Sequence, residues 1–577
     1  MKHYISFANK LLFIIDKKIS KILPLIFLFL FLSFIEILGI GLIIPFINLI
    51  LNPENFNEII FSNKITFETF TDKLILFSGI LIIIFIIKTI LSIFVRWVIS
   101  KFAYEQYAYL QIKMLSLYQK MDYLDFTKRN YSDYTRNVKE MTSSVISAIE
   151  IYLRLVSEII IFVIIITYLC FVNFQVVVSL TLILGLIAFI FEYFLKPLAI
   201  RYGKAKAEAS SLIYQGIDNA IKGKKEIKIL QKENFFLNIL KNGADKVCLN
   251  ETKQSLISNS PRYILELVLI IFLLSFLTIL VLSNDNDIAS VLPILSVFAV
   301  AGARLLPGSA VIIHSLNMLN YFNKATLIIY HDIKKLNKKI YKKNNKQLTL
   351  NTKKIIFKKL ELKNIFFKYP KSRKYILNNI SINLKAKDCI GIVGLSGSGK
   401  TTLMDLILGL IKPNKGKIFL NEELIDTKSK KWLEIVSYLP QESLVMEDTI
   451  KTNVSFDNNE SQNNAKKIKF AIKKANIEKL IEALPKKLNT KIGKSGVRLS
   501  GGQNKRIAIA RTFFHDRQII IMDEATSSLD IKTESLILDQ LKILKKKKTI
   551  ILITHNSNTL KYCDKIFRIK NGKITKI

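Results

Sequence analysis

Long apolar runs separated by charged segments fill the first half of the chain. Six of these runs reach roughly 20 residues, the length at which a helix crosses the hydrocarbon core of a bilayer; they lie near residues 22–51, 74–99, 151–173, 176–199, 263–283 and 288–312. Because lipid offers the backbone no hydrogen-bond partner, each run is predicted to be a transmembrane helix. Breaks at Gly41 and Pro45 in the first run, and at Gly302 and Pro307 in the last, predict kinked helices that line a cavity.

The connections between the runs differ in charge. Lysine and arginine are frequent in residues 1–21, 101–139 and 201–253, whereas residues 52–73 are richer in acidic side chains and residues 284–287 hold two aspartates. Since basic connections stay on the cytoplasmic side of a membrane, the first three segments are predicted to be cytoplasmic and the other two to face outward. The two long cytoplasmic connections predict helices that continue beyond the membrane.

A lysine-rich segment separates this half from one of a different pattern. Residues 334–354 are predicted to be a linker between a helical transmembrane domain, 1–333, and a second domain, 355–577. In the second domain, helical patterns alternate with short β-branched runs at Ile390–Val393, Ile519–Met522 and Thr549–Thr554. This alternation is typical of an α/β domain with a largely parallel sheet.

Composition agrees with a membrane protein and excludes other classes. Of the 577 residues 50% are hydrophobic, and the mean hydropathy is +0.29, which is too apolar for two soluble domains. The net charge of +40 would suit nucleic acid, but the lysines lie in loops without base-stacking aromatics beside them, so nucleic acid is not expected as a partner. Four cysteines without C-x-x-C spacing indicate neither a disulfide framework nor a zinc site. The first apolar run is too long for a signal-peptide core and is expected to remain as a membrane span.

A glycine-rich loop follows the first β-branched run and opens a helical pattern. The residues expected to bind phosphates are Gly394, Ser396, Gly397, Ser398, Gly399, Lys400, Thr401 and Thr402. Glycines let backbone N–H groups surround phosphates, and the helix N-terminus adds positive potential. Lys400 would neutralise the β- and γ-phosphates and the Thr401 hydroxyl would hold Mg²⁺, so this strand–loop–helix context predicts a P-loop that binds ATP.

Two acidic residues end the second β-branched run. Asp523 is predicted to hold Mg²⁺ and Glu524 to polarise the attacking water. This pattern is weak by itself, because apolar strands that end in Asp-Glu are common.

Residues 499–503 read Leu-Ser-Gly-Gly-Gln between these two motifs, and here the domain resembles the ABC ATPases. The resemblance implies that Ser500, Gly501, Gly502 and Gln503 contact nucleotide bound to a second copy of the chain. It further implies roles for Tyr369 in stacking on adenine, Gln441 in sensing Mg²⁺ and contacting the membrane domain, Asp530 in the D-loop and His555 at the γ-phosphate. Tyr375 is the alternative to Tyr369. Because one chain has one phosphate loop and one signature, a homodimer with two shared sites is expected.

The order of the two domains resembles the exporters of this family. The resemblance implies that segments near 125–135 and 212–223 are coupling helices that dock on the ATPase domains. The chain departs from exporters before the signature, where Lys491 and Lys494 replace the two glutamates of a segment of TEVGERG type.

Ionisable side chains within apolar runs are functional candidates, because lipid makes them costly. Lys88, Arg262 and Arg304 are predicted to line a cavity that attracts a phosphate-bearing cargo. Glu158 and Glu266 are expected instead to pair with basic neighbours inside the bundle.

The membrane half is similar to the flippases of bacterial lipid-linked oligosaccharides, at residues 260–263 and 304–307. In those flippases, a short outward helix at the place of residues 52–73 touches the polyprenyl tail. The sequence therefore predicts a homodimeric ATP-hydrolysing flippase in the bacterial inner membrane, with cytoplasmic ATPase domains. Membrane lipids and an amphipathic lipid-linked substrate are its expected partners. Export of a lipopolysaccharide precursor, a peptide or a drug is the alternative, and an ATP-gated channel or a non-transporting regulator is one of a different class.

Overall fold

The chain divides into two compact units. The computed structural model describes residues 2–16, 19–51, 70–283, 288–344, 355–370, 372–425, 430–457, 461–493, 496–524, 531–554 and 556–577. Met1–Met121 and Arg129–Lys346 form the first unit, and Asp122–Lys128 and Gln347–Ile577 form the second. The segment Asp122–Lys128 therefore clusters with the C-terminal residues, although it lies early in the sequence. The domain boundaries expected from the sequence stay predictions.

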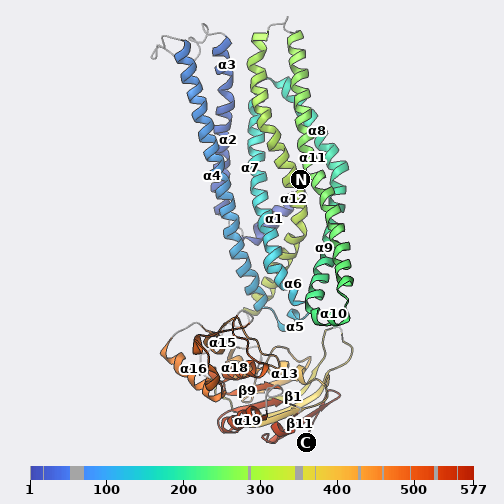
Figure 1. Cartoon of the computed structure of the whole chain (residues 1–577), viewed down its shortest axis with the longest axis vertical. Coiled ribbons are helices and arrows are strands. Elements are labelled where there is room, and N and C mark those ends of the chain that lie inside the picture. Colours follow the sequence, from blue (N-terminus) through green and yellow to red (C-terminus); the bar gives the residue numbers. More distant parts are fainter. Residues whose placement is uncertain are drawn as a thin grey trace. The chain divides into compact units, whose positions relative to one another are not determined.

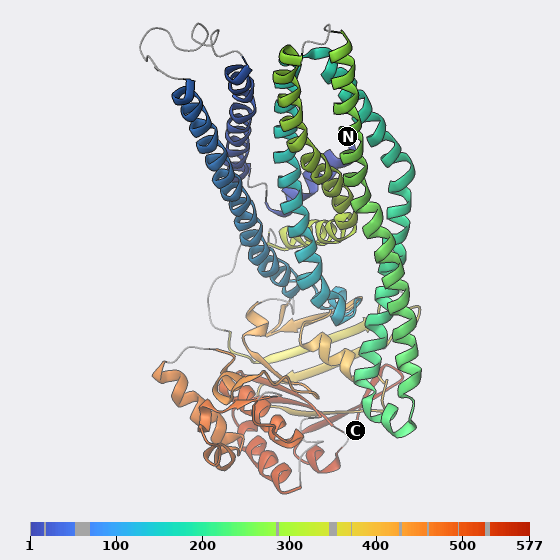
Figure 2. The same ribbon diagram turned by 45° about the horizontal axis from the view of Figure 1, so that its top comes forward.

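The first unit is built from helices. They are α1 (Lys2–Ile14), α2 (Ile19–Gly41), α3 (Ile43–Leu51), α4 (Phe70–Gln119), α6 (Tyr131–Arg136), α7 (Thr142–Val172), α8 (Phe174–Ile190), α9 (Lys196–Lys222), α10 (Lys224–Leu230), α11 (Glu233–Ser283) and α12 (Ile288–Asn344), with π-helical turns η2 (Asn137–Met141) and η3 (Phe191–Leu195). In Figures 1 and 2, α9 runs beside α11 and α7 runs beside α12. The described parts of all six apolar runs lie almost entirely on these helices.

Four helical segments of the described residues are long and apolar enough to cross a membrane. They are Ser20–Leu51, Phe70–Gln119, Asp133–Val172 and Leu292–Lys338. The runs near 176–199 and 263–283 lie on α8, α9 and α11, outside this group, so the number of six spans stays a prediction. With 50 residues, α4 has a length of about 75 Å, far more than the roughly 30 Å core of a bilayer. Such a helix extends well beyond a membrane.

The predicted linker is helical in its first part. Residues 334–344 continue α12, and Leu336 is buried there. Lysine is a good helix former, so a lysine-rich sequence does not end a helix that packs through one apolar face. Residues 345–354 lie outside the described part of the chain.

The described residues of the second unit form an α/β domain with three sheets. Its strands are β1 (Lys359–Phe367), β2 (Leu377–Lys385), β3 (Cys389–Val393), β4 (Lys415–Leu420), β5 (Glu423–Leu424), β6 (Val436–Leu439), β7 (Asp448–Thr449), β8 (Lys491–Ile492), β9 (Ile519–Asp523), β10 (Thr549–Ile553), β11 (Lys565–Lys570) and β12 (Lys573–Lys576). The largest sheet has the order β12-β11-β3-β10-β9-β6, parallel except at β12. An antiparallel sheet has the order β2-β1-β4-β5. The predicted strands are confirmed as β3, β9 and β10, which are adjacent in the parallel sheet.

Two buried apolar clusters cover the two faces of the parallel sheet, and the second unit also contains helices. The helices are α5 (Tyr123–Phe126), α13 (Lys400–Ile407), α14 (Lys430–Leu433), α15 (Ile450–Ser455), α16 (Gln462–Lys474), α17 (Glu478–Glu482), α18 (Gly501–Phe514), α19 (Ile531–Lys545) and α20 (Ser557–Leu560), with the 3₁₀ turn η4 (Lys487–Asn489). Along β9, Ile519 and Ile521 join one buried cluster while Ile520 and Met522 join the other. Burial on both faces explains why these strands read as unbroken apolar runs. Leu124 of α5 packs against the first cluster.

Candidate functional site

The phosphate loop connects β3 to α13 in a shape that requires glycine. A Cβ atom at Gly394 would lie 2.5 Å from the carbonyl oxygen of Ile569, so no larger residue fits there. Gly397 and Gly399 have φ angles of +77° and +106°, in the left-handed region that side chains disfavour. The loop therefore exposes backbone at the N-terminus of α13, where anions bind favourably.

Two side chains of the loop fit a polyanion. Lys400 donates from Nζ to the carbonyl oxygens of Gly394, at 2.6 Å, and Leu395, at 3.0 Å, which holds the ammonium group across the loop. The Ser398 hydroxyl is buried and has no hydrogen-bond partner among the described residues. A phosphate oxygen could accept from both groups, so these residues fit the triphosphate of ATP.

Asp523 is buried at the end of β9, near the half-buried Asp405 and Glu524. Burial, with the charge of Glu524, raises the pKa of Asp523 above its usual range, and nearby Lys505 and Lys400 oppose this shift. Burial, with the charge of Asp523, also raises the pKa of Asp405 to about 6. The pKa values of the two carboxyls stay raised because nearby positive charge compensates only in part for their burial and mutual repulsion. A divalent cation would supply this charge, so Asp523 and the hydroxyl of Thr401, at the start of α13, fit Mg²⁺.

Glu524 is brought together with Gln441, 83 residues earlier in the chain. Glu524 has a φ angle of +45°, and its backbone N–H donates to the carbonyl oxygen of Ile553 at 2.9 Å. Its carboxylate accepts a hydrogen bond from Gln441 Nε2 at 2.7 Å. The turn after β9 therefore places the predicted catalytic carboxylate beside the predicted Mg²⁺ sensor.

Lys505 holds the backbone at Pro440 and Gln441. The sequence did not indicate this contact. Its side chain is buried within α18, and Nζ donates to the carbonyl oxygens of Pro440, at 3.1 Å, and Gln441, at 2.6 Å. Burial lowers the pKa of Lys505, and the charges of Asp523 and Glu524 oppose this shift. The sequence held no signal for this burial, because a lysine on a helix is usually exposed.

The signature residues cap α18 in a capping box. Ser500 Oγ accepts from the backbone N–H of Gln503 at 3.2 Å, and Gln503 Oε1 accepts from the backbone N–H of Ser500 at 2.8 Å. The spacing Ser-x-x-Gln is the sequence pattern of this motif. A Cβ atom at Gly501 would meet nothing within 4 Å. Among the described residues, no atom of this chain therefore occupies the space beside Gly501. A group from outside could approach the N-terminus of α18 there.

The predicted adenine-stacking residue lies next to the phosphate-loop helix. The Tyr369 hydroxyl is 3.3 Å from Thr402 Oγ1, and the Tyr369 ring packs edge-on against Phe367. Tyr375 packs instead against Phe366. The stacking role stays a prediction for either tyrosine, and the predicted residues Asp530, His555 and Lys494 lie outside the described residues.

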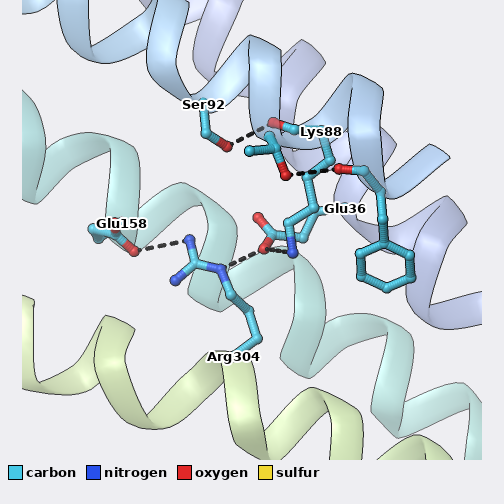
Figure 3. A network of polar contacts seen from close by, with 7 residues as sticks. Glu36, Lys88, Ser92, Glu158 and Arg304 are labelled. Carbon is cyan, nitrogen blue, oxygen red and sulfur yellow. Dashed lines mark hydrogen bonds and ion pairs between the residues drawn. The ribbon is translucent and has the colours of Figure 1, made fainter. Parts of the chain in front are cut away.

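In the first unit, a cluster of four charges joins four helices (Figure 3). Glu36 of α2 is only 1% exposed and accepts from Lys88 of α4 at 2.9 Å and from Nε of Arg304 of α12. Arg304 Nη2 also contacts Glu158 Oε2 of α7 at 3.2 Å. Two cations and two carboxylates balance each other, which makes their burial tolerable.

This cluster shows how the predicted cargo-binding residues are placed. Lys88 and Arg304 meet at Glu36, and Glu158 pairs with a basic neighbour as expected. Arg262 lies on α11, and its side chain is outside the described residues. The structure thus connects two of the three candidate cations to a common carboxylate.

Comparison with known proteins identifies the C-terminal unit. Residues 377–527 match the ABC transporter family model. This ABC transporter ATPase domain includes the phosphate loop, the signature and the acidic pair described above. The ATPase domain expected from the sequence is confirmed.

Known relatives match part of the chain. An export ATP-binding/permease protein of Rickettsia bellii is 38% identical over 217 residues, and an ATP-dependent lipid A-core flippase of Pseudoalteromonas translucida is 37% identical over 223 residues. Each match covers 37% of this chain and 37% of the relative, so the chain matches little more than a third of each relative's length.

A solved structure extends the comparison to almost the whole chain. A bacterial Atm1-family ABC exporter with ATP bound has a TM-score of 0.73 at 18% sequence identity, over 96% of this chain and 94% of that chain. The chain therefore has the fold of an ABC exporter, with a helical unit before the ATPase domain. The predicted exporter architecture is confirmed at this level.

We expect Lys505→Met to slow ATP hydrolysis about tenfold while ATP affinity changes less than about threefold, because the segment that holds Gln441 loses two charge-assisted hydrogen bonds. Turnover and fluorescent-nucleotide binding measure the two effects. Lys546→Met, at an exposed position of the second unit, is the control. Since methionine suits a buried site, the melting temperature should not fall. Wild-type turnover in the Lys505→Met variant would contradict this positioning role.

Proposed function

We propose that the chain is one half of a homodimeric, ATP-driven exporter that moves an amphipathic lipid-linked saccharide across the bacterial inner membrane. The observation that carries this proposal is the exporter fold of a chain whose ATPase domain holds a phosphate loop, the acidic pair Asp523 and Glu524, and a capped signature helix. Six membrane spans and a cytoplasmic ATPase domain, as the charge pattern of the sequence predicts, belong to the same proposal.

The chain's own residues would divide the work of hydrolysis. ATP with Mg²⁺ supplies the phosphoanhydride bond that is cleaved and the charge that the acidic residues lack. Lys400 and Ser398 hold the phosphates, and Thr401 and Asp523 hold the cation. Glu524 accepts the proton of the attacking water and so polarises it, while Gln441 orients the Glu524 carboxylate through the hydrogen bond of 2.7 Å.

The second copy would complete each site. One chain has one phosphate loop and one signature, and the open space around Gly501 at the N-terminus of α18 allows a phosphate of the partner's nucleotide to approach. The signature helix then adds its N-terminal dipole to the site. The capping box fixes the orientation of Ser500 before the partner arrives.

In this proposal, an anionic, lipid-linked cargo binds at the charge cluster of the first unit by displacing one of its carboxylates. Glu158 is the more weakly held partner of Arg304, since its contact of 3.2 Å is the longest in the cluster. A phosphate that replaced Glu158 would gain a bidentate contact with the guanidinium. The similarity to oligosaccharide flippases at residues 260–263 and 304–307 favours a saccharide on that phosphate.

A lipopolysaccharide precursor is the second candidate cargo. The relative from Pseudoalteromonas translucida bears the name ATP-dependent lipid A-core flippase. Both candidates are phosphate-bearing lipids, so they differ in the sugar and the lipid rather than in the charge that Arg304 would recognise. Flipping assays with each lipid in the same proteoliposomes separate them.

Glu524→Gln should leave ATP binding intact and reduce turnover at least ~100-fold, because it keeps the side-chain shape but removes the general base. Binding and hydrolysis are measured on the same preparation. Glu447→Gln, on the loop before β7, is the control. Turnover close to wild type in the Glu524→Gln variant would exclude Glu524 as the base.

Mixing a Lys400→Ala chain with a Ser500→Arg chain should restore about one intact site per mixed dimer, because both defects then fall in the same shared site. Each variant alone should be inactive. ATP hydrolysis by the affinity-purified mixed dimer measures the rescue. A mixed dimer as inactive as both parents, while crosslinking shows that it forms, would contradict independent shared sites.

Replacing both Arg262 and Arg304 with glutamine should abolish flipping of a fluorescent polyprenyl-pyrophosphate saccharide in proteoliposomes, while basal ATP hydrolysis stays within about threefold of wild type. Lysine replacements should rescue flipping only in part, since an ammonium cannot make a two-pronged contact. Arg96→Gln, in α4, is the control. Undiminished flipping by the double glutamine variant would exclude a cargo role for both arginines.

A further inference from the structure

A second buried polar cluster lies in the first unit, away from the charges around Glu36. Asp332 of α12 accepts two hydrogen bonds from the guanidinium of Arg129, at 2.7 and 2.8 Å, and a third from the Tyr118 hydroxyl of α4 at 2.7 Å. Asn137 Nδ2 of η2 donates to the same hydroxyl at 3.2 Å. Tyr118, Asn137 and Asp332 are each at most 5% exposed.

Aromatic contacts fix the geometry of this cluster further. The Tyr118 and Tyr134 rings meet edge to face with their centroids 4.8 Å apart, and the Arg129 guanidinium lies 6.0 Å from the Tyr134 centroid. A bidentate arginine–carboxylate pair specifies both distance and orientation, which a single contact does not. The cluster therefore defines how α4, α12 and the segment at Arg129 are oriented to one another.

The position of the cluster along the chain is its main feature. The chain passes between the two units after Met121, after Lys128 and after Lys346. Tyr118 lies just before the first passage and Arg129 directly after the second. Asp332 lies on α12, which continues to Asn344, two residues before the third passage. One cluster thus connects all three segments of the first unit that lead into the ATPase unit.

A neighbouring ion pair, between Arg136 and Asp133, does not connect distant segments of the chain. Arg136 Nη2 contacts Asp133 Oδ1 at 3.0 Å within one helical turn, and both side chains are exposed. An exposed pair of this kind contributes little to stability or orientation. In the Arg129–Asp332 pair the Asp332 carboxylate is only 7% exposed, although the Arg129 side chain is 36% exposed, and the pair joins residues 203 positions apart.

We propose that Arg129, Asp332 and Tyr118 are positioning residues that make the three connecting segments move as one body. Movement of Asp122–Lys128, whose Leu124 packs into the core of the ATPase unit, would then pass to α4 and α12 together. This inference rests on the proposed function, because it assigns the route by which ATP hydrolysis changes the helical unit.

The test is the double variant Arg129→Gln with Asp332→Asn, which removes the ion pair without leaving an unpaired charge. The matched control is Arg136→Gln with Asp133→Asn, which makes the same exchange in the exposed pair. Each full-length chain is reconstituted in liposomes. ATP hydrolysis is measured beside the change in tryptic cleavage of the helical unit that Mg-ATP with vanadate induces.

We expect the double variant to hydrolyse ATP within about threefold of wild type, while the nucleotide-induced change in cleavage falls at least about fivefold, the lower end of typical coupling effects. The control should match wild type in both measurements. Tyr118→Phe, which removes one hydroxyl, should lose part of the change and remains informative if the double variant does not fold. Arg129→Lys, which keeps the charge but not the two-pronged contact, should show a nucleotide-induced change in cleavage between those of the double variant and wild type.

Three results would overturn the inference in different ways. A wild-type change in cleavage in both the double variant and Tyr118→Phe would exclude the coupling role alone. If the double variant loses ATP hydrolysis and the nucleotide-induced change in cleavage to the same extent, the cluster only supports the fold. If the wild-type chain hydrolyses ATP without any nucleotide-induced change, the proposed export function fails, and the coupling role fails with it.

Discussion

A charged side chain can be buried only where opposite charge or hydrogen bonds compensate for the lost water, and this constraint organises both units. Glu36 is almost fully buried because Lys88 and Arg304 both reach it. Lys505 is buried because two backbone carbonyls accept from it. In each case the compensation connects elements that are distant in sequence, so the cost of burial fixes the positions of helices and loops.

The nucleotide site is where this compensation is incomplete. Asp523 and Asp405 are partly buried beside each other, and the pKa of each carboxyl is raised. The Ser398 hydroxyl lacks a partner among the described residues. The carboxylates at the end of β9 therefore need more positive charge, and the phosphate loop with Lys400 and Ser398 needs an acceptor. The site becomes balanced when a cation and an anion arrive together, which is the charge pattern of Mg-ATP.

The sequence predicted the ATPase domain well because its chemistry depends on local spacing. The phosphate loop needs glycines next to Lys400, and β9 needs an unbroken apolar run before Asp523, so both are visible within a few residues. The contact between Gln441 and Glu524 follows from the order of the parallel strands, and the sequence did not predict it, although each residue had been assigned a role. Lys505 could not be found in this way, since a lysine on a helix is usually exposed.

The membrane half was harder to predict, because its specific contacts join residues on separate helices. The sequence singled out Lys88 and Arg304 as costly charges, but no spacing indicated that both would meet Glu36. Apolar runs also cannot show where a helix stops once it leaves the bilayer, so residues 334–344 were expected as linker and are part of α12. Hydropathy predicts which segments are helical, whereas charge pairing across helices depends on the tertiary structure.

One helix, α12, carries a member of each of the two polar clusters described above. Arg304 and Asp332 lie on α12 about 42 Å apart along its axis, at 1.5 Å per residue. Residues 309–332 contain neither glycine nor proline, the usual causes of a kink, so this part of α12 has no sequence feature that would favour bending. Pro307 and Gly308 lie next to Arg304 instead, where the helix lacks a backbone donor. Under the coupling proposed above, a displacement at Asp332 would be transmitted along the part of α12 that has no helix-breaking residue. It would reach the proline-containing turn beside Arg304, whose guanidinium contacts Glu36 and Glu158.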